Sequence, residues 1–487
     1  MAGVGFELKK LFEKKGITAK VRAYGYAGLV ISGPMILGVL LLLGIMYLAN
    51  RGGATRLERE LLISLFTYAL LFSLIASSVL SVITVRYVAD MIYTGNTRAI
   101  LPSFYGSSLL TLFFGGASYG IFLVFSGISL AYQIMSFLFF LTLLIVWIEM
   151  NFLTAISDYK NVLITFAGAL ILMMLTGFGL IQYTNMNTTL SLLLAAWLAY
   201  GLMAVRYFNL IFLYFPKGVG SALRFLKWID KYPTLLFLGL LIHFGLFGHL
   251  IIMWNSPLQI PVQGWFKGAP TYDVSALIAI ISILITTVTF VTATETKFHP
   301  LYKKYFSYLN GTGNIVDIEM TEQKMIQVLD EEMGYLIVKQ VITTILFISV
   351  GTIILPRTAL GFTSDMLGIY RMLCVGYALY AIGNSMFMIL LYFEDNKGAF
   401  RAALIFAVST NLFTFIFKDL DSAFYGFGFI LGSGLFALYT ATHLRKFIDE
   451  LKFHVLAKRP IYSIEKKGRL SRFINQIEAR EITNKSE

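Results

Sequence analysis

The sequence predicts an all-α integral membrane protein with twelve transmembrane helices arranged as two six-helix bundles. Of its 487 residues, 57% are hydrophobic and only 14% are charged, which indicates that the bilayer is the solvent for most of the chain. Apolar runs also recur along the chain at lengths of about 20 residues, enough to cross about 30 Å of hydrocarbon. Finally, the density of positive charge alternates from one loop to the next, as it does in multi-pass membrane proteins.

Twelve apolar runs follow one another along the chain. We place the spans near residues 24–49, 61–88, 101–126, 130–157, 161–183, 189–214, 233–254, 272–295, 335–356, 366–393, 399–417 and 421–443. The first run is too long for the core of a signal peptide, so we expect it to be retained. Gly33-Pro34 within that run predicts a break in the helix that frees backbone polar groups.

The charges of the loops predict the orientation in the membrane. With a cytoplasmic N-terminus, 30 of the 39 Lys and Arg residues fall in inside segments and only 6 in outside loops. Because Lys and Arg are enriched on the cytoplasmic side, we expect both termini to be cytoplasmic and the protein to lie in the cytoplasmic membrane. The net charge of +12 is then explained by contact with the inner leaflet and indicates no nucleic-acid partner.

The spans and loops divide the chain into five segments. These are a basic amphipathic helix at 1–22, an N-terminal bundle at 23–216, a linker helix at 217–232, a C-terminal bundle at 233–443 with a cytoplasmic excursion at 297–339, and a basic tail at 444–487. The linker carries Leu223, Leu226 and Ile229 opposite its basic residues, which favours a short interfacial helix over a solvated connection. The tail places an apolar stripe on one helix face, formed by Leu470, Phe473, Ile474 and Ile477.

A weak internal repeat supports two halves of six spans. Thr94-Gly95-Asn96 follows the second span, and Thr312-Gly313-Asn314 follows the eighth, which is its counterpart in the second half. A matching tripeptide at equivalent positions favours a parallel duplication about an axis along the membrane normal.

The cytoplasmic excursion carries the one acidic cluster of the sequence. Its members are Glu319, Glu322, Asp330, Glu331 and Glu332. One interpretation is a solvated helix face, and the other is a docking surface for a basic cytosolic partner.

Signatures of catalysis and of metal binding are weak. The sequence contains no P-loop and no His pair at the spacing of a zinc site. Asp419 and Asp421 resemble a metal–nucleotide pair, but they fall in an outside loop, where nucleotide sugars are absent. The single cysteine, Cys374, lies within an apolar run, and the lone His243 is best explained as a packing residue. We therefore expect no enzymatic activity, no metal and no cofactor.

Charged residues within or next to the spans are the best candidates for function, because a charge inside the membrane is costly. The candidates for a substrate pathway are Glu149, Arg206, Arg86, Asp90, Glu295 and Arg371. Lys339 also falls within a predicted span, and Glu394 directly follows one. Residues at the helix ends could instead extend their charges to the interface.

A buried ion pair between Glu149 and Arg206 is a specific expectation. Both residues stand nine or ten positions from the cytoplasmic ends of their spans, so at about 1.5 Å per residue both lie roughly 14 Å into the membrane. Pairing would lower the cost of burying either charge. The pair would either shape a polar vestibule for a sugar chain or act as a static clamp within the bundle.

Several segments of the sequence resemble the PelG family of membrane transporters for Pel exopolysaccharide. The matching segments are Met1–Leu11 (MAGVGFELKKL), Arg22-Ala23-Tyr24, Ser32-Gly33-Pro34, Arg86–Asp90 (RYVAD) and Leu391–Asp395 (LYFED). The resemblance implies the fold of the polysaccharide and lipid-linked flippases and multidrug exporters. It further implies export of an amino-sugar polymer for biofilm, in partnership with a cytosolic PelF-like glycosyltransferase and other Pel synthase subunits.

Two other functions remain open on the sequence alone. A flippase for lipid-linked oligosaccharide would have the same architecture with a different cargo. A non-transporting scaffold that holds a synthase at the membrane would have no reason to keep charges of both signs within its spans.

Overall fold

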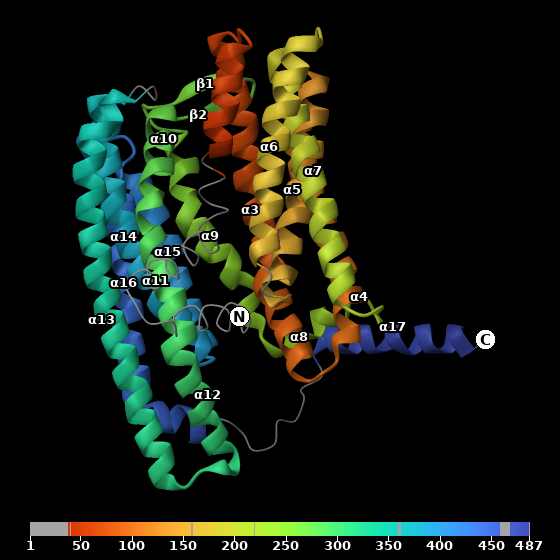
Figure 1. The fold of residues 1–487 in the computed structure, drawn as a ribbon, viewed down its shortest axis with the longest axis vertical. Helices are drawn as coiled ribbons and strands as arrows, with labels where there is room; N and C mark the ends of the chain where they lie inside the picture. Colours follow the sequence, from red (N-terminus) through yellow and green to blue (C-terminus); the bar gives the residue numbers. More distant parts are fainter. Residues whose placement is uncertain are drawn as a thin grey trace. The chain divides into compact units, whose positions relative to one another are not determined.

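The computed structural model of the chain is almost entirely helical (Figure 1). It describes residues 38, 40–156, 159–218, 220–358, 362–457 and 468–486. The chain divides into two compact units. The first comprises the described residues of Pro34–Ala269 and of Ile464–Glu487, and the second comprises those of Pro270–Ser463. The predicted helix at 1–22 and the predicted break at Gly33-Pro34 lie outside the described residues.

The first unit contains long helices and one small hairpin. Its elements are a short helix Leu40–Arg51, α3 (Arg56–Tyr93), η1 (Thr97–Ala99), α4 (Ile100–Phe125), α5 (Leu130–Ile156), α6 (Tyr159–Tyr183), α7 (Thr188–Tyr214), η2 (Arg224–Leu226), α8 (Lys227–Lys231), α9 (Pro233–Met253), β1 (Ile260–Gln263), β2 (Phe266–Gly268) and α17 (Arg469–Ser486). Helix α5 is central, because α3, α4 and α7 all pack against it.

The second unit is built in the same way from long helices. Its elements are α10 (Pro270–Ala279), η3 (Ile280–Ile283), α11 (Leu284–Ala293), η4 (Thr294–Phe298), α12 (His299–Ser307), η5 (Tyr308–Thr312), α13 (Ile315–Ile354), η6 (Leu355–Arg357), α14 (Ser364–Tyr392), α15 (Asn396–Phe417), η7 (Ser422–Phe424), α16 (Phe427–Asp449) and η8 (Phe453–Ala457). Helix α14 packs against α10, α13 and α16, and α15 lies along α16.

The described residues contain eleven helices that are long and apolar enough to cross a membrane. They overlap eleven of the twelve predicted spans, and the short apolar helix Leu40–Arg51 overlaps the end of the first predicted span. The protein is therefore a multi-pass membrane protein. Apolar length alone suffices for this prediction because every backbone polar group in a bilayer must be satisfied within a helix or a closed barrel.

Two helices begin with a reciprocal side-chain cap and are far longer than a bilayer requires. At α3, the Glu58 amide donates to the Thr55 hydroxyl, and the Thr55 amide donates to the Glu58 carboxylate (3.3 and 2.8 Å). Asn314 and Asp317 form the same arrangement at α13. With 40 residues, α13 is about 60 Å long, so roughly half of it must project beyond the hydrocarbon core.

The helical run 270–312 continues beyond its predicted span through a wide turn. Residues Thr294–Phe298 form a π-helical turn just before Pro300. A proline lacks an amide hydrogen and collides with the carbonyl one turn earlier, and a wider turn relieves that clash without ending the helix. The helical backbone breaks at Asn310 and Gly311, where Gly311 has a φ of +104°. Thr312-Gly313-Asn314 therefore lies between α12 and α13, as Thr94-Gly95-Asn96 lies between α3 and α4.

A β-hairpin between α9 and α10 was not predicted. Strands β1 and β2 pair antiparallel around Gly264, which has a φ of +57°. The Trp265 amide donates to the Ser126 carbonyl (2.8 Å), and the Tyr68 hydroxyl donates to the Lys267 carbonyl (3.0 Å). Tyr68 also stacks on Trp254 with ring centroids 4.5 Å apart. These contacts fasten the hairpin to the first unit.

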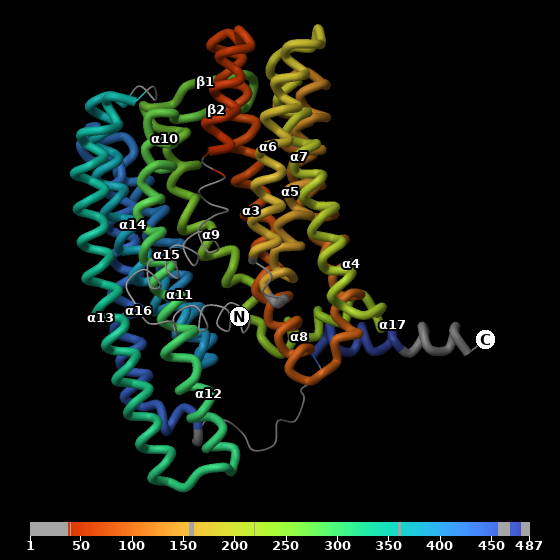
Figure 2. The backbone as a smooth tube through the Cα atoms, in the orientation of Figure 1, coloured from red at the N-terminus to blue at the C-terminus, as the bar shows by residue number. Residues whose placement is uncertain are grey.

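Within the linker, the 3-10 turn η2 is followed by the short helix α8, and the tail helix α17 packs against both (Figure 2). Of the linker's predicted stripe, only Ile229 lies in α8; Leu226 ends η2 and Leu223 precedes it. The Lys227 ammonium lies 2.7 Å from the Glu478 carboxylate, and the Ser471 amide donates to the Asp230 carboxylate (2.7 Å). Ile474 is fully buried, whereas Phe473 of the predicted apolar stripe is exposed. The contacts therefore join the linker and the tail in the first unit.

Helix α9 packs on α3 within the first unit. The sequence predicts that residues 233–254 belong to the C-terminal bundle, with the boundary in the linker. By contacts, the two units divide between Ala269 and Pro270. Which six spans form each bundle in the membrane stays a prediction.

Candidate functional site

Glu149 is the most deeply buried charged residue among the pathway candidates. It lies on α5 with 1% of its surface exposed, and its Oε2 atom has no hydrogen-bond partner. The Tyr207 hydroxyl of the adjacent helix α7 is close enough to interact with it electrostatically, but donates to the Val162 carbonyl (3.0 Å). An unpaired charge at the bilayer centre costs about 2.5–3.5 kcal/mol or more, so this position calls for a functional explanation.

The predicted ion pair between Glu149 and Arg206 is wrong. Arg206 is exposed, whereas Glu149 is buried, and the structure forms no ion pair between them. The buried face of α7 carries Met203 and Tyr207, and Arg206 points about 100° away from Tyr207 around the helix. Counting residues from the helix ends gave both residues a similar depth, but depth does not specify which way a side chain points.

Arg86 and Asp90 are the pathway candidates that the structure brings together. The Arg86 guanidinium lies 3.1 Å from the Asp90 carboxylate, which also accepts a hydrogen bond from the indole of Trp228 (2.7 Å). Trp228 packs edge-to-face on Tyr87 with centroids 4.7 Å apart, and Arg86 lies over the ring of Tyr232. These contacts bind the linker to the end of α3, which gives both charges a structural role.

The other two pathway candidates lie in the second unit and do not contact each other in the structure. Glu295 is 7% exposed in the π-helical turn, next to the hydroxyl of Tyr392. Arg371 is exposed, and its Nε donates to the Thr352 hydroxyl (3.1 Å). The wide turn displaces Glu295 from the regular helical ladder, and such turns are frequent at functional sites.

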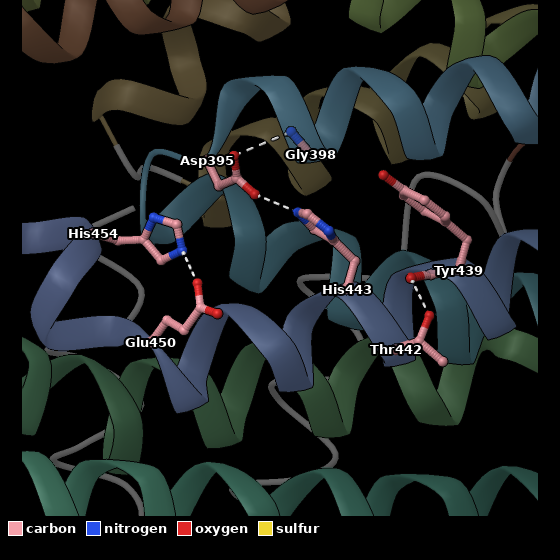
Figure 3. Close-up of polar contacts among 7 residues, drawn as sticks. All are labelled: Asp395, Gly398, Tyr439, Thr442, His443, Glu450 and His454. Atoms are coloured by element: carbon pink, nitrogen blue, oxygen red, sulfur yellow. Dashed lines mark hydrogen bonds and ion pairs between the residues drawn. The ribbon is translucent and has the colours of Figure 1, made fainter. Parts of the chain in front are cut away.

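A second carboxylate cluster, around Asp395, was missed as a site (Figure 3). Asp395 caps α15 by accepting from the Gly398 amide (3.1 Å), and its other oxygen lies 2.7 Å from Nε2 of His443 on α16. The ring of Tyr439 stacks on His443. A Cβ at position 398 would fall 2.2 Å from His443 Nε2, so a larger residue would have to displace the His443 ring. The cluster ties the start of α15 to α16.

Asp90 and Asp395 each end one of the sequence segments that resemble the PelG family, RYVAD and LYFED. In the structure both are carboxylates that hold helix ends together. In the sequence, both residues lie just after the end of a predicted span, and this shared position was the signal that they belong together. The partners Trp228 and His443 could not be inferred, because they are 138 and 48 residues away.

The candidate docking residues make different contacts. Glu332 pairs with Lys297, and Gln327 donates to Glu331 (2.9 Å). Glu319 and Glu322 instead line a groove between α13 and the end of α16. Groups of His, Cys, Asp and Glu that could hold a metal ion are absent from the described part of the chain.

Comparisons with known proteins identify a family and a fold. The model of the family PelG, described as "Putative exopolysaccharide Exporter (EPS-E)", matches residues 1–456. No curated protein matches the sequence.

Several solved transporters share the fold. A MATE in the straight conformation is 14% identical, with a TM-score of 0.59 over 88% of this chain and 96% of its own. An inward-facing multidrug resistance MATE family transporter of the MOP superfamily is 13% identical, with a TM-score of 0.58 over 93% of this chain and 99% of its own. A MOP superfamily transporter from Pyrococcus furiosus is 13% identical, with a TM-score of 0.54 over 88% and 96%.

At these identities the likeness establishes the fold alone, which is that of a MATE-like transporter. The family follows from the sequence match, because it covers all but the last residues of the chain. The chain belongs to the PelG family of exopolysaccharide exporters.

Proposed function

We propose that this chain exports a polysaccharide, an amino-sugar polymer of the Pel kind, across the cytoplasmic membrane and has no enzymatic activity of its own. The family match over residues 1–456 is the observation that carries this proposal. The MATE-like fold supports it, because solved structures with this fold are membrane transporters.

The proposed pathway includes Glu149 and Glu295, the two buried acidic candidates. A buried carboxyl oxygen without a partner is costly to keep, so Glu149 is best explained by a second state in which water or sugar hydroxyls reach it. Arg206 and Arg371 are proposed as exposed donors to hydroxyl and acetamido oxygens of the polymer.

In the proposed arrangement, the chain has twelve transmembrane helices, both termini are cytoplasmic, and a cytosolic glycosyltransferase supplies the polymer. The excess of Lys and Arg in alternate segments supports this orientation. A flippase for lipid-linked oligosaccharide is the second candidate, since a solved structure with this fold is described as a multidrug resistance transporter and the fold alone does not select a polymer.

Reporter fusions test the proposed topology. Fusions after Asn50 and after Gly264 should report an outside location, because these loops carry few positive charges. Fusions after Gly220, Gly313 and Lys467 should report an inside location. An inside signal at Gly264 would refute the arrangement.

Cysteine accessibility separates a transporter from a static scaffold. Cys374 is fully buried, and its replacement by alanine leaves a background without thiols. In a transporter, a cysteine at position 149 should react with a membrane-impermeant maleimide in cells that make the polymer, because the site opens to water during each cycle. A cysteine at Leu143, which is buried on the same helix, is the control for general unfolding. Equal protection at both positions would favour the scaffold.

A further inference from the structure

The groove between α13 and the end of α16 is lined by both carboxylates and apolar side chains. Its volume is about 590 Å³, and it lies entirely within the second unit. The lining residues are Glu319, Glu322, Gln323, Ile326, Ile448, Asp449, Glu450, Lys452 and Phe453. We call it the acidic groove, because four carboxylates face a single ammonium there.

The internal pairing of the groove leaves negative charge unmatched. The Lys452 ammonium lies 3.0 Å from Glu319 and 4.0 Å from Glu322. The hydrogen bond to Glu319 and the charge of Glu322 together raise the pKa of Lys452, which therefore stays charged. Glu450 lies 3.5 Å from the ring nitrogen of His454, which also stacks on Phe447.

Glu322 is the second, independent indication of a ligand. Its side chain is only 9% exposed, and its Oε2 atom is buried without a hydrogen-bond partner. The contact with Lys452, at 4.0 Å, is too long for a hydrogen bond. A buried acceptor without a donor is costly, so a donor brought in by a ligand would be stabilised at this position.

The shape and composition of the groove limit what can bind. Anionic lipid headgroups and nucleic acids would be repelled by the carboxylates. A bare cation would leave the apolar walls formed by Ile326, Ile448 and Phe453 uncovered, and Phe453 is 56% exposed. A ligand that satisfies both features carries Lys or Arg side chains beside apolar ones.

We propose that the acidic groove binds a short basic amphipathic segment of a cytosolic protein, with a Lys or Arg side chain reaching Glu322. The inference rests on the proposed function, because the proposed topology is what places the groove on the cytoplasmic side of the membrane. It narrows the docking surface suggested by the sequence from five acidic residues to Glu319 and Glu322, and adds Asp449 and Glu450 from α16. Asp330, Glu331 and Glu332 take no part.

Binding can be measured on the full chain in nanodiscs of zwitterionic lipid, which lack the negative surface that would attract a basic probe. The probe is a fluorescent helical peptide of Leu and Lys, and the same peptide with Glu in place of Lys is its control. Fluorescence anisotropy should show binding of the Lys peptide alone, weakening as salt is added.

Variants locate the binding. Glu319→Lys with Glu450→Lys replaces two exposed groove charges and should weaken binding by about tenfold or more, because like charges then face the peptide. Asp330→Lys with Glu331→Lys makes the same change in charge on the same helix outside the groove and should leave the affinity nearly unchanged. Glu322→Gln should weaken binding without altering the charge of the rim.

Three outcomes would overturn the proposal: no binding by the unaltered chain, equal loss in both pairs of Lys variants, or tighter peptide binding after removal of residues 2–22. The last result would mean that the chain's own basic N-terminal segment occupies the groove. None of these outcomes depends on export, so failure of the groove and failure of the proposed function can be told apart.

Discussion

Glu149→Lys should abolish accumulation of folded protein, whereas Glu149→Gln should leave the fold intact and lower export by about tenfold or more. Lysine would place a long cation at a position that is only 1% exposed and where an Oε2 atom already lacks a hydrogen-bond partner. The cost of about 2.5–3.5 kcal/mol or more is a large share of the stability of a typical domain, about 5–15 kcal/mol. Glutamine keeps the size and removes only the ionisable group.

Fluorescence-detected size exclusion after solubilisation measures the folded fraction, and extracellular polymer measures export. The Gln variant is the matched control for the Lys variant, because both change the same position. Export at the wild-type level by a well-folded Gln variant would remove Glu149 from the pathway. A well-folded Lys variant would show that the site is wet or lies outside the membrane.

Gly432→Ala should destabilise the second unit by about 1–3 kcal/mol, the usual cost of overpacking a tight interface. Helices α15 and α16 meet along Gly428 and Gly432, two glycines four residues apart, as in close helix pairs in membranes. A Cβ at position 432 would fall 2.4 Å from the Cα of Thr410. Because this neighbour is backbone, the clash is relieved only by separating the helices.

Gly434→Ala in the same helix is the matched control. Its Cβ would lie 3.7 Å from a methyl group of Leu379, an ordinary contact. Alanine is favoured over glycine within helices by about 1 kcal/mol, so this variant should be neutral or slightly stabilised. The two substitutions therefore differ in the sign of their effect on the thermal unfolding midpoint. Equal midpoints would show that α15 and α16 are not packed as the structure has them.

The sequence predicted the membrane spans well because a bilayer demands apolar length, and length can be read directly. It could not predict which helix face is buried. On α7, Leu202 and Val205 are exposed while Ala199 and Met203 are buried, so apolar residues lie on both faces. Lipid is as apolar as the protein interior, and the periodicity that separates core from surface in soluble proteins is lost. The wrong prediction of an ion pair between Glu149 and Arg206 follows from this loss.

The sequence also could not predict contacts between segments that are far apart in the chain. The acidic cluster was recognised as charge on one helix, but Asp449, Glu450 and Lys452 join it only because α16 ends beside α13. The hairpin at residues 260–268 was hidden within a loop, although Gly264 between short apolar stretches was a signal for a turn. The apolar spacing of the linker predicted a helix over residues 217–232, but regular α-helix forms only at Lys227–Lys231, after the 3-10 turn Arg224–Leu226.

The location of the polymer shows whether this chain is the exporter. In cells that synthesise the polymer, removal of this chain should leave the polymer inside the cytoplasmic membrane and reduce the extracellular amount to background, and the intact chain should restore it. Polymer can be quantified on both sides with a lectin after separating cells from medium, with and without lysis. Unchanged extracellular polymer in cells that lack the chain would contradict its assignment as the exporter.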